Sequence, residues 1–279
     1  MCSRFSLLLA LGASLLSPIA GAAPIIIKGS ITATAPITAA MPKFRAAGIE
    51  ITIDTEANTS SAVAAVGHGQ ADLAVATRPI TAAERAAYPD RRMDEITIGF
   101  QVLAFGVPAD VWYGGVRTIT REQAQQIYEG DIKNWKQMGG ADRPLKFFNP
   151  EAGHGVWEIF TNWVYTDSRK APLGGQFETV AGGEETRNVI EFNAGSISLI
   201  SPGRVDRHGV FALSIKTDEA TVAPDLKSVL NRTYPLARPL ELISGDRPTG
   251  DTKHVIDFML SPLGREFLLK ADFIPLSED

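Results

Sequence analysis

The sequence predicts an α/β protein of two lobes, with mixed, mostly parallel sheets flanked by helices. Short apolar or β-branched runs alternate with helical segments through most of the 279 residues. Capping boxes at Thr81–Glu84 and Thr120–Gln123 mark helix starts, because their side chains satisfy backbone groups that the first turn leaves free. The early capped helices and a separate block of elements in the middle of the chain indicate the two lobes.

A targeting segment is expected over residues 1–22. Arg4 supplies its positive end, and Leu7 to Leu16 form an apolar run that is too short to span a bilayer. Ala20-Gly21-Ala22 is a small-residue cleavage pattern. We therefore expect a signal peptide that is cut near Ala22, and a mature chain that is periplasmic or secreted.

The composition argues against several kinds of partner and chemistry. The formal net charge is −5 and no basic run occurs, which disfavours nucleic acid and anionic membrane surfaces. No later run of about 18 apolar residues exists, so membrane insertion is not expected. Cys2 would leave with the signal peptide, and His68, His208 and His254 lack metal-ligand spacing. With no Gly-x-Ser-x-Gly elbow either, we expect neither an enzyme nor a cofactor. We also expect a monomer.

The first part of the chain reads as strands followed by capped helices. The predicted strands cover Ile25–Ile27, Ile49–Thr55 and Asp72–Ala76, and the predicted helices cover Pro36–Ala47 and Ser60–Val66. Thr34 is the expected cap of the first helix, and Thr59 or Ser60 that of the second. A long extended segment is expected from Ile96 to Val107, and a turn from Asp110 to Gly115.

The second part continues the alternation. Strands are predicted at Pro144–Phe148, Ile197–Ile200, Val210–Ile215 and Arg238–Ile243, and helices at Gly155–Tyr165, Glu184–Asn193, Lys253–Leu260 and Pro262–Lys270. The chain is expected to cross between the lobes at Leu103–Val107 and Tyr234–Leu240. Lobe 1 would then comprise residues 23–105 and 235–279, and lobe 2 residues 106–234.

Four loops follow a predicted strand and precede a predicted helix. They are Gly29–Thr32, Glu56–Ser60, Thr77-Arg78 and Glu151–Gly155. In an open α/β sheet, loops at the carboxyl ends of strands line one crevice, and helix starts present free N–H groups and a favourable dipole. Three of these loops are rich in Ser, Thr or Gly. The pattern suits a tetrahedral oxyanion, which is held by many neutral donors from several directions.

Ordered motifs along nearly the whole mature chain resemble one family, the periplasmic phosphate-binding proteins of ABC phosphate transporters. The matching segments are Gly29–Thr32 with Pro36, Asp72–Pro79, Gly130–Trp135, Tyr234–Leu240, Leu260–Gly264 and Phe273–Leu276. The resemblance implies a type II periplasmic binding fold, with a ligand cleft between two lobes that close on the ligand. It also implies phosphate or a similar oxyanion as ligand and an ABC permease as partner.

The resemblance carries ligand positions onto this chain. The first loop contributes Ser30, Ile31 and Thr32, largely through backbone N–H groups; the second contributes Thr59 and Ser60; and the third contributes Thr77. In the fourth loop, the family's Ser-Gly-Thr falls on His154, Gly155 and Val156. The family's arginine falls on Pro150, and neither Pro150 nor Asn149 can replace a guanidinium.

Two functions remain open on these residues. The first is a solute-binding protein for phosphate or a similar oxyanion, and the second is a related module whose anion site has decayed and which acts as a sensor or interaction protein in the cell envelope. A third function, a hydrolase of phosphate esters, is disfavoured because no nucleophile or metal cluster is recognisable in the sequence. A protonated His154 would replace part of the lost charge and strengthen binding at lower pH. More ordinary roles are helix capping for Thr59, Ser60 and Thr77, an ion pair for Arg78, and an exposed loop position for His154.

Overall fold

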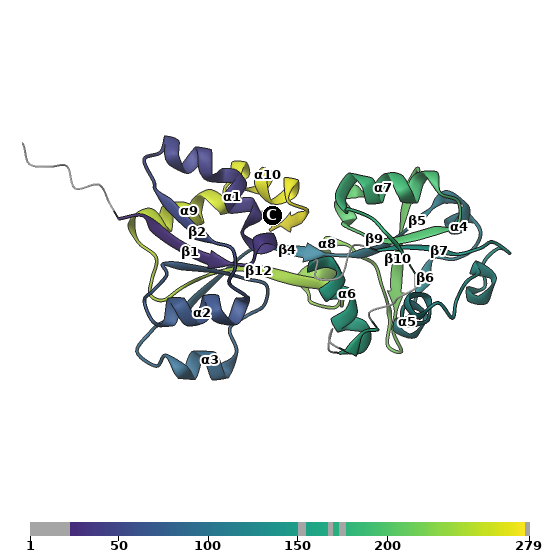
Figure 1. The fold of residues 1–279 in the computed structure, drawn as a ribbon, viewed down its shortest axis with the longest axis horizontal. Helices are drawn as coiled ribbons and strands as arrows, with labels where there is room; N and C mark the ends of the chain where they lie inside the picture. The colour runs from purple at the N-terminus through teal and green to yellow at the C-terminus, as the bar shows by residue number, and fades with distance from the viewer. Residues whose placement is uncertain (1–22, 150–154, 167–169, 173–176, 277–279) are drawn as a thin grey trace, which may run out of the picture.

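A computed structural model describes residues 23–149, 155–166, 170–172 and 177–276. These residues form two sheets, each covered by helices, in two lobes that lie side by side (Figure 1). The α/β fold class predicted from the sequence is confirmed. The predicted signal peptide, together with Pro150 and His154, lies outside the described residues.

The sheet of the first lobe has the strand order β13-β4-β12-β3-β1-β2. Its strands are β1 (Ile25–Gly29), β2 (Ile51–Asp54), β3 (Leu73–Ala76), β4 (Asp94–Val102), β12 (Ala237–Ser244) and β13 (Phe273–Pro275). The helices are α1 (Ile31–Ala46), α2 (Thr59–Gly67), α3 (Ala82–Ala87), α9 (Gly250–Leu260) and α10 (Pro262–Lys270). One apolar cluster joins the sheet to α1, α9 and α10, and another joins it to α2. The sheet is therefore buried on both faces.

The sheet of the second lobe has the order β11-β10-β5-β9-β7-β8, with β6 beside β10. Its strands are β5 (Ala104–Pro108), β6 (Thr118–Ile119), β7 (Lys146–Asn149), β8 (Glu178–Thr179), β9 (Ser196–Ile200), β10 (Val210–Lys216) and β11 (Thr221–Val222). The helices are α4 (Ala109–Tyr113), α5 (Arg121–Glu129), α6 (Gly155–Tyr165), α7 (Gly183–Phe192) and α8 (Leu226–Leu230). The core of this lobe includes Trp135, whose indole N–H donates to the carbonyl of Gly195 at 2.9 Å. Packing is therefore the role of Trp135, as its sequence context indicates.

The chain passes from one sheet to the other at Leu103, between β4 and β5, and returns just before β12. At this junction the Leu103 N–H donates to the Leu236 carbonyl at 2.9 Å, and the buried Tyr234 hydroxyl donates to the Leu103 carbonyl at 2.8 Å. Burial raises the pKa of Tyr234, so the phenol stays protonated and keeps this bond. The two crossing segments are thus bonded to each other.

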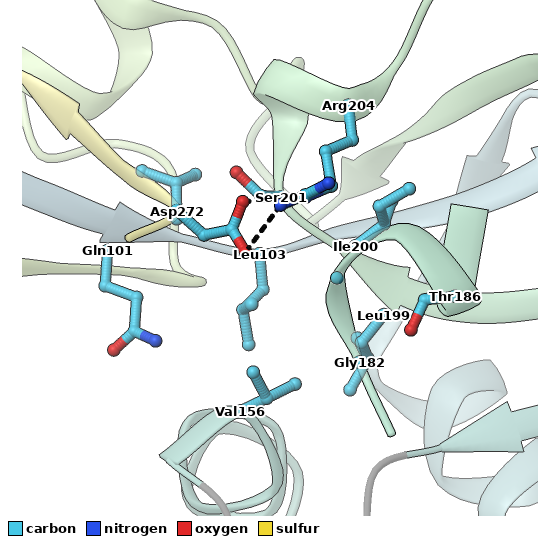
Figure 2. A pocket seen from close by; sticks show the side chains of 12 residues that line it. Gln101, Leu103, Val156, Gly182, Thr186, Leu199, Ile200, Ser201, Arg204 and Asp272 are labelled. Carbon is cyan, nitrogen blue, oxygen red and sulfur yellow. Dashed lines mark hydrogen bonds and ion pairs between the residues drawn. The ribbon is translucent and has the colours of Figure 1, made fainter. Parts of the chain in front are cut away.

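A side-chain ion pair also links the lobes. Arg204, after β9, meets Asp272, before β13, with Nε–Oδ1 and Nη2–Oδ2 distances of 2.7 and 3.2 Å (Figure 2). The Arg204 Nη1 also donates to Glu184 at 3.0 Å. Arg204 is therefore neutralised by carboxylates from both sides of the junction.

The structure corrects two predictions about where helices lie, and each correction has a physical reason. Helix α1 begins at Ile31 rather than at Pro36, because Ser30 caps it by accepting the Ala33 N–H at 3.4 Å. Pro36 lies inside the helix, where its ring nitrogen has no N–H to donate to the carbonyl of Thr32. The expected turn at residues 110–115 is largely the short helix α4, which follows Pro108 without a side-chain cap.

The cap of α2 also differs from the expectation. Asn58 caps this helix by accepting the Ser61 N–H at 3.0 Å, so neither Thr59 nor Ser60 has that role. Asn is among the strongest N-cap residues, which explains the choice. The hydroxyls of Thr59 and Ser60 are consequently available for other contacts.

The sheets are mixed, as predicted, but among the described residues parallel pairs do not outnumber antiparallel ones. Strands β1, β2 and β3 pair in parallel, but β12 pairs antiparallel with both β3 and β4, and β5 pairs antiparallel with β9 and β10. These antiparallel strands include the crossing strands β4, β5 and β12 (Figure 1). The need to enter and leave the second lobe therefore reverses strand direction near the junction.

Candidate functional site

Three of the four predicted loops meet at one edge of the first sheet. β1 lies between β2 and β3, and all three are parallel, so their carboxyl ends share that edge. Helix α1 begins one residue after Ser30, and α2 begins after a loop of four residues that follows β2. Ser30 forms an isolated bridge with Glu56, which joins the first loop to the second.

The second and third loops are joined through threonine hydroxyls. The Thr77 N–H donates to Thr59 Oγ1 at 3.2 Å, and the two hydroxyl oxygens are 3.5 Å apart. Both residues are half-buried. The structure thus brings together Thr59 and Thr77, which are 18 residues apart in sequence, at the edge where an oxyanion was predicted.

The first loop presents backbone rather than side chain. The Ser30 hydroxyl is used in capping α1, and Ile31, the first helical residue, has a side chain that is 73% exposed. Thr32 is half-buried in the same turn. The Ala33 N–H donates to the Ser30 hydroxyl, whereas the N–H groups of Ile31 and Thr32 have no acceptor within this 16-residue helix and point toward its N-terminal end, where an anion is favoured.

Arg78 follows Thr77 but is already neutralised. Its Nη1 and Nη2 donate to Glu84 at 2.8 and 2.7 Å, and Nη2 also donates to Ser60 Oγ at 2.8 Å. The hydrogen bonds from Arg78 lower the pKa of Glu84 to about 2, with Thr81 of the capping box contributing. Arg78 therefore acts as an ion-pair residue, and its bond to Ser60 joins the third loop to the second.

The ion pair between Arg78 and Glu84 predicts that the free energy of unfolding depends on pH. A carboxyl whose pKa is lower in the folded protein stabilises it fully above the unfolded pKa near 4.5, and this contribution is lost as pH falls toward 2. We expect the loss to be about 1–2 kcal/mol, after allowance for solvent screening of the partly exposed Arg78. Urea unfolding between pH 5 and 2 measures it.

A matched variant isolates that contribution. Glu84→Gln removes the titrating group, so the difference in unfolding free energy between the protein and the variant should shrink as pH falls from 5 to 2. Asp257→Asn is the control, because Asp257 forms an exposed pair with Lys253 on α9. The prediction would be contradicted if the difference in unfolding free energy between the unaltered protein and Glu84→Gln stayed constant from pH 5 to pH 2.

The fourth loop belongs to the second lobe. The described part begins at Gly155, the start of α6, and Val156 is half-buried there. Val156 lines a small pocket of about 50 Å³ together with Gln101 and Leu103 of the first crossing (Figure 2). The start of α6 therefore faces the junction, while the Asn149 side chain is fully buried and unavailable as a replacement for arginine.

One cation at this junction was not among the predicted site residues. Arg238 pairs with Gln101 across β12 and β4, and its Nε and Nη2 donate to Gln101 Oε1 at 2.9 and 2.6 Å. Burial lowers the pKa of Arg238, and the Glu158 carboxylate opposes this effect. The sequence contains Arg238 within the motif Tyr234–Leu240, but its pairing with a residue 137 positions earlier has no local signal.

The remaining functional predictions concern packing and metals. Trp157 is buried, and its indole N–H lies 3.4 Å from the Tyr128 hydroxyl, so it packs rather than stacks on a ligand. Within the described residues, no group of three or more His, Cys, Asp or Glu side chains is placed to hold a metal ion. Over the same residues, no helix is long and apolar enough to cross a membrane.

Two sheet-based lobes joined by paired crossings, with helix starts and hydroxyl loops gathered at one edge, form a two-lobed binding-protein fold. The PBP superfamily domain matches residues 20–263, and the chain belongs to that superfamily.

Curated relatives are phosphate-binding proteins. PstS of Bacillus subtilis is 22% identical over 264 residues, which cover 90% of this chain and 80% of that protein. PstS of Staphylococcus saprophyticus is 24% identical over 201 residues, which cover 68% of this chain and 60% of the relative, so less than two thirds of its length is matched. The family resemblance drawn from the sequence motifs is confirmed.

Solved structures show the same fold. An ABC-type phosphate transport receptor from Vibrio cholerae superposes with a TM-score of 0.67 at 23% identity, over 90% of this chain and all of that one. A possible phosphate binding protein from Planctomyces limnophilus gives a TM-score of 0.75 at 18% identity, over 91% of this chain and 93% of that one. The two-lobed architecture is thus shared.

Proposed function

We propose that the protein binds phosphate, or a similar tetrahedral oxyanion, between its lobes and delivers it to an ABC permease. The observation that carries this proposal is the link between Thr59 and Thr77, which places two hydroxyls beside the starts of α1 and α2. Neutral donors that converge from several loops suit an oxyanion. The names of the relatives, phosphate-binding proteins and a phosphate transport receptor, support the same ligand.

The proposed role is transport rather than catalysis. The lobes would close on the ligand, and the closed form would dock on the permease. The ligand contacts would come from Ser30, Ile31 and Thr32; Thr59, Ser60 and Thr77; and His154, Gly155 and Val156. We propose an exported monomer that works without a cofactor, and the targeting pattern of residues 1–22 supports the export.

Calorimetric titration tests the proposal. The mature protein, freed of carried-over anion, is titrated with phosphate and then with sulfate and arsenate. Saturable one-to-one phosphate binding is the expected result. Absence of heat, together with no thermal stabilisation by millimolar phosphate, would refute the proposal. It would favour the alternative of a sensor or interaction module, which the proline at position 150 motivates.

A further inference from the structure

Arg238 lies on β12, at the part of the strand that extends past the carboxyl end of β3. Strand β12 pairs antiparallel with β3 so that Glu241 lies opposite Ala76, the last residue of β3. Residues of β12 that precede Glu241 therefore extend past the carboxyl end of β3, over the edge where the Thr77 loop begins. Arg238 lies three positions before Glu241, on the strand that connects the two lobes.

The contacts of Arg238 direct it toward the second lobe. Its guanidinium is bound to the Gln101 carboxamide, and Gln101 is almost fully buried in the pocket that Val156 also lines. Figure 2 shows the Gln101 and Leu103 side chains extending toward the turn of α6 that carries Val156. Arg238 thus lies between the edge with the hydroxyl loops and the start of α6.

Within the described part of the chain, Arg238 has no ion-pair partner, although the Glu158 carboxylate acts on its charge from a distance. Among the described residues, no carboxylate lies within ion-pair distance of its guanidinium, and the bound carboxamide of Gln101 is neutral. The other arginines of this region differ, since Arg78 is neutralised by Glu84 and Arg204 by Asp272 and Glu184. A half-buried cation with no carboxylate in direct contact is unfavourable, and a bound anion would relieve that cost.

The guanidinium also retains free donors. It has five N–H groups, and the bonds to Gln101 use one from Nε and one from Nη2. Gln101 holds the planar group in one orientation, which reduces the conformational entropy lost when a second partner binds. A planar fork with unused N–H groups is suited to two oxygens of a tetrahedral anion.

We propose that Arg238 supplies the positive charge for the bound oxyanion, in the role that the family assigns to the arginine replaced here by Pro150, and that Gln101 orients it. This assignment rests on the proposed function. It explains how a site without an arginine in the fourth loop retains a cation, because the cation comes from the crossing strand instead. The ligand class it favours is a di-anionic tetrahedral oxyanion such as hydrogen phosphate.

Titration of variants with inorganic phosphate tests the assignment. Arg238→Gln should raise Kd roughly ten- to a hundredfold, the range expected for a lost charge-assisted contact. Gln101→Glu should raise Kd about tenfold, because it neutralises Arg238 internally while leaving the guanidinium and the packing in place. Arg117→Gln is the control for loss of one positive charge, since Arg117 lies over the Trp112 ring in the second lobe, outside the proposed site.

The outcomes separate the assignment from the proposed function. If the unaltered protein binds phosphate and both Arg238→Gln and Gln101→Glu stay within about twofold of its Kd, as Arg117→Gln should, the assignment is wrong. If the unaltered protein binds no phosphate, the proposed function fails and the assignment falls with it. Thermal unfolding without phosphate checks folding, and if Arg238→Gln does not fold, Gln101→Glu alone decides.

Discussion

Thr59→Val is expected to raise the Kd for phosphate roughly tenfold, the effect of losing about one hydrogen-bonding group worth 1.4 kcal/mol. Valine has nearly the same shape but no hydroxyl, so the proposed ligand loses a donor. The Thr77 N–H loses its acceptor at 3.2 Å as well, which disturbs the third loop. Isothermal titration calorimetry measures the change.

Two further variants separate this effect from a general loss of stability. Thr59→Ser keeps the hydroxyl and should bind phosphate nearly as tightly as the unaltered protein. Thr52→Val makes the same chemical change at an exposed position of β2 and should leave Kd unchanged. Equal affinities for Thr59→Val and Thr52→Val would show that the Thr59 hydroxyl has no part in binding.

Gly29→Ala is expected to lower the free energy of unfolding by about 2 kcal/mol and to weaken phosphate binding at the same time. Gly29 ends β1 just before Ser30 caps α1. A Cβ at this position would lie 2.8 Å from the Val75 carbonyl oxygen and 3.0 Å from Thr34 Cγ2. The methyl group would therefore separate β1 from β3 and displace the start of α1.

Denaturant unfolding and phosphate titration are measured on the same preparation of Gly29→Ala. The control is Gly203→Ala, because a Cβ at Gly203 would have the Ser201 hydroxyl as its nearest neighbour, at 3.9 Å. We expect Gly203→Ala to change stability by less than about 0.5 kcal/mol. Unfolding free energies for Gly29→Ala that match those of Gly203→Ala would contradict the close packing at this turn.

Local signals predicted much of the fold. The capping boxes at Thr81 and Thr120 are present as expected, and Ser261 caps α10 with Pro262 at its first position. These features depend on residues within one helical turn of each other, so short sequence patterns suffice to identify them. Helix α4 was missed because its five residues carry no cap and no apolar period.

The candidate site was predictable only in part. Loops that follow neighbouring parallel strands must meet at one edge, and this rule correctly placed Thr59 beside Thr77. Which hydroxyls remain available was not predictable, because Asn58 competes successfully for the cap of α2. The partner of Arg238 could not be inferred either, since Gln101 is 137 residues away and is brought to it by the pairing of β12 with β4.

From the sequence came the alternation of strands and helices, the loops rich in hydroxyl groups and the family to which the chain belongs. Each follows from periodicity, turn chemistry or ordered motifs, all of which are local properties of a chain. The tertiary structure decided which charges are balanced: Arg78 is paired with Glu84, whereas Arg238 is bound to a neutral carboxamide. That distinction depends on burial and on partners brought together by strand pairing, because the energy of a charge is determined by its surroundings in space.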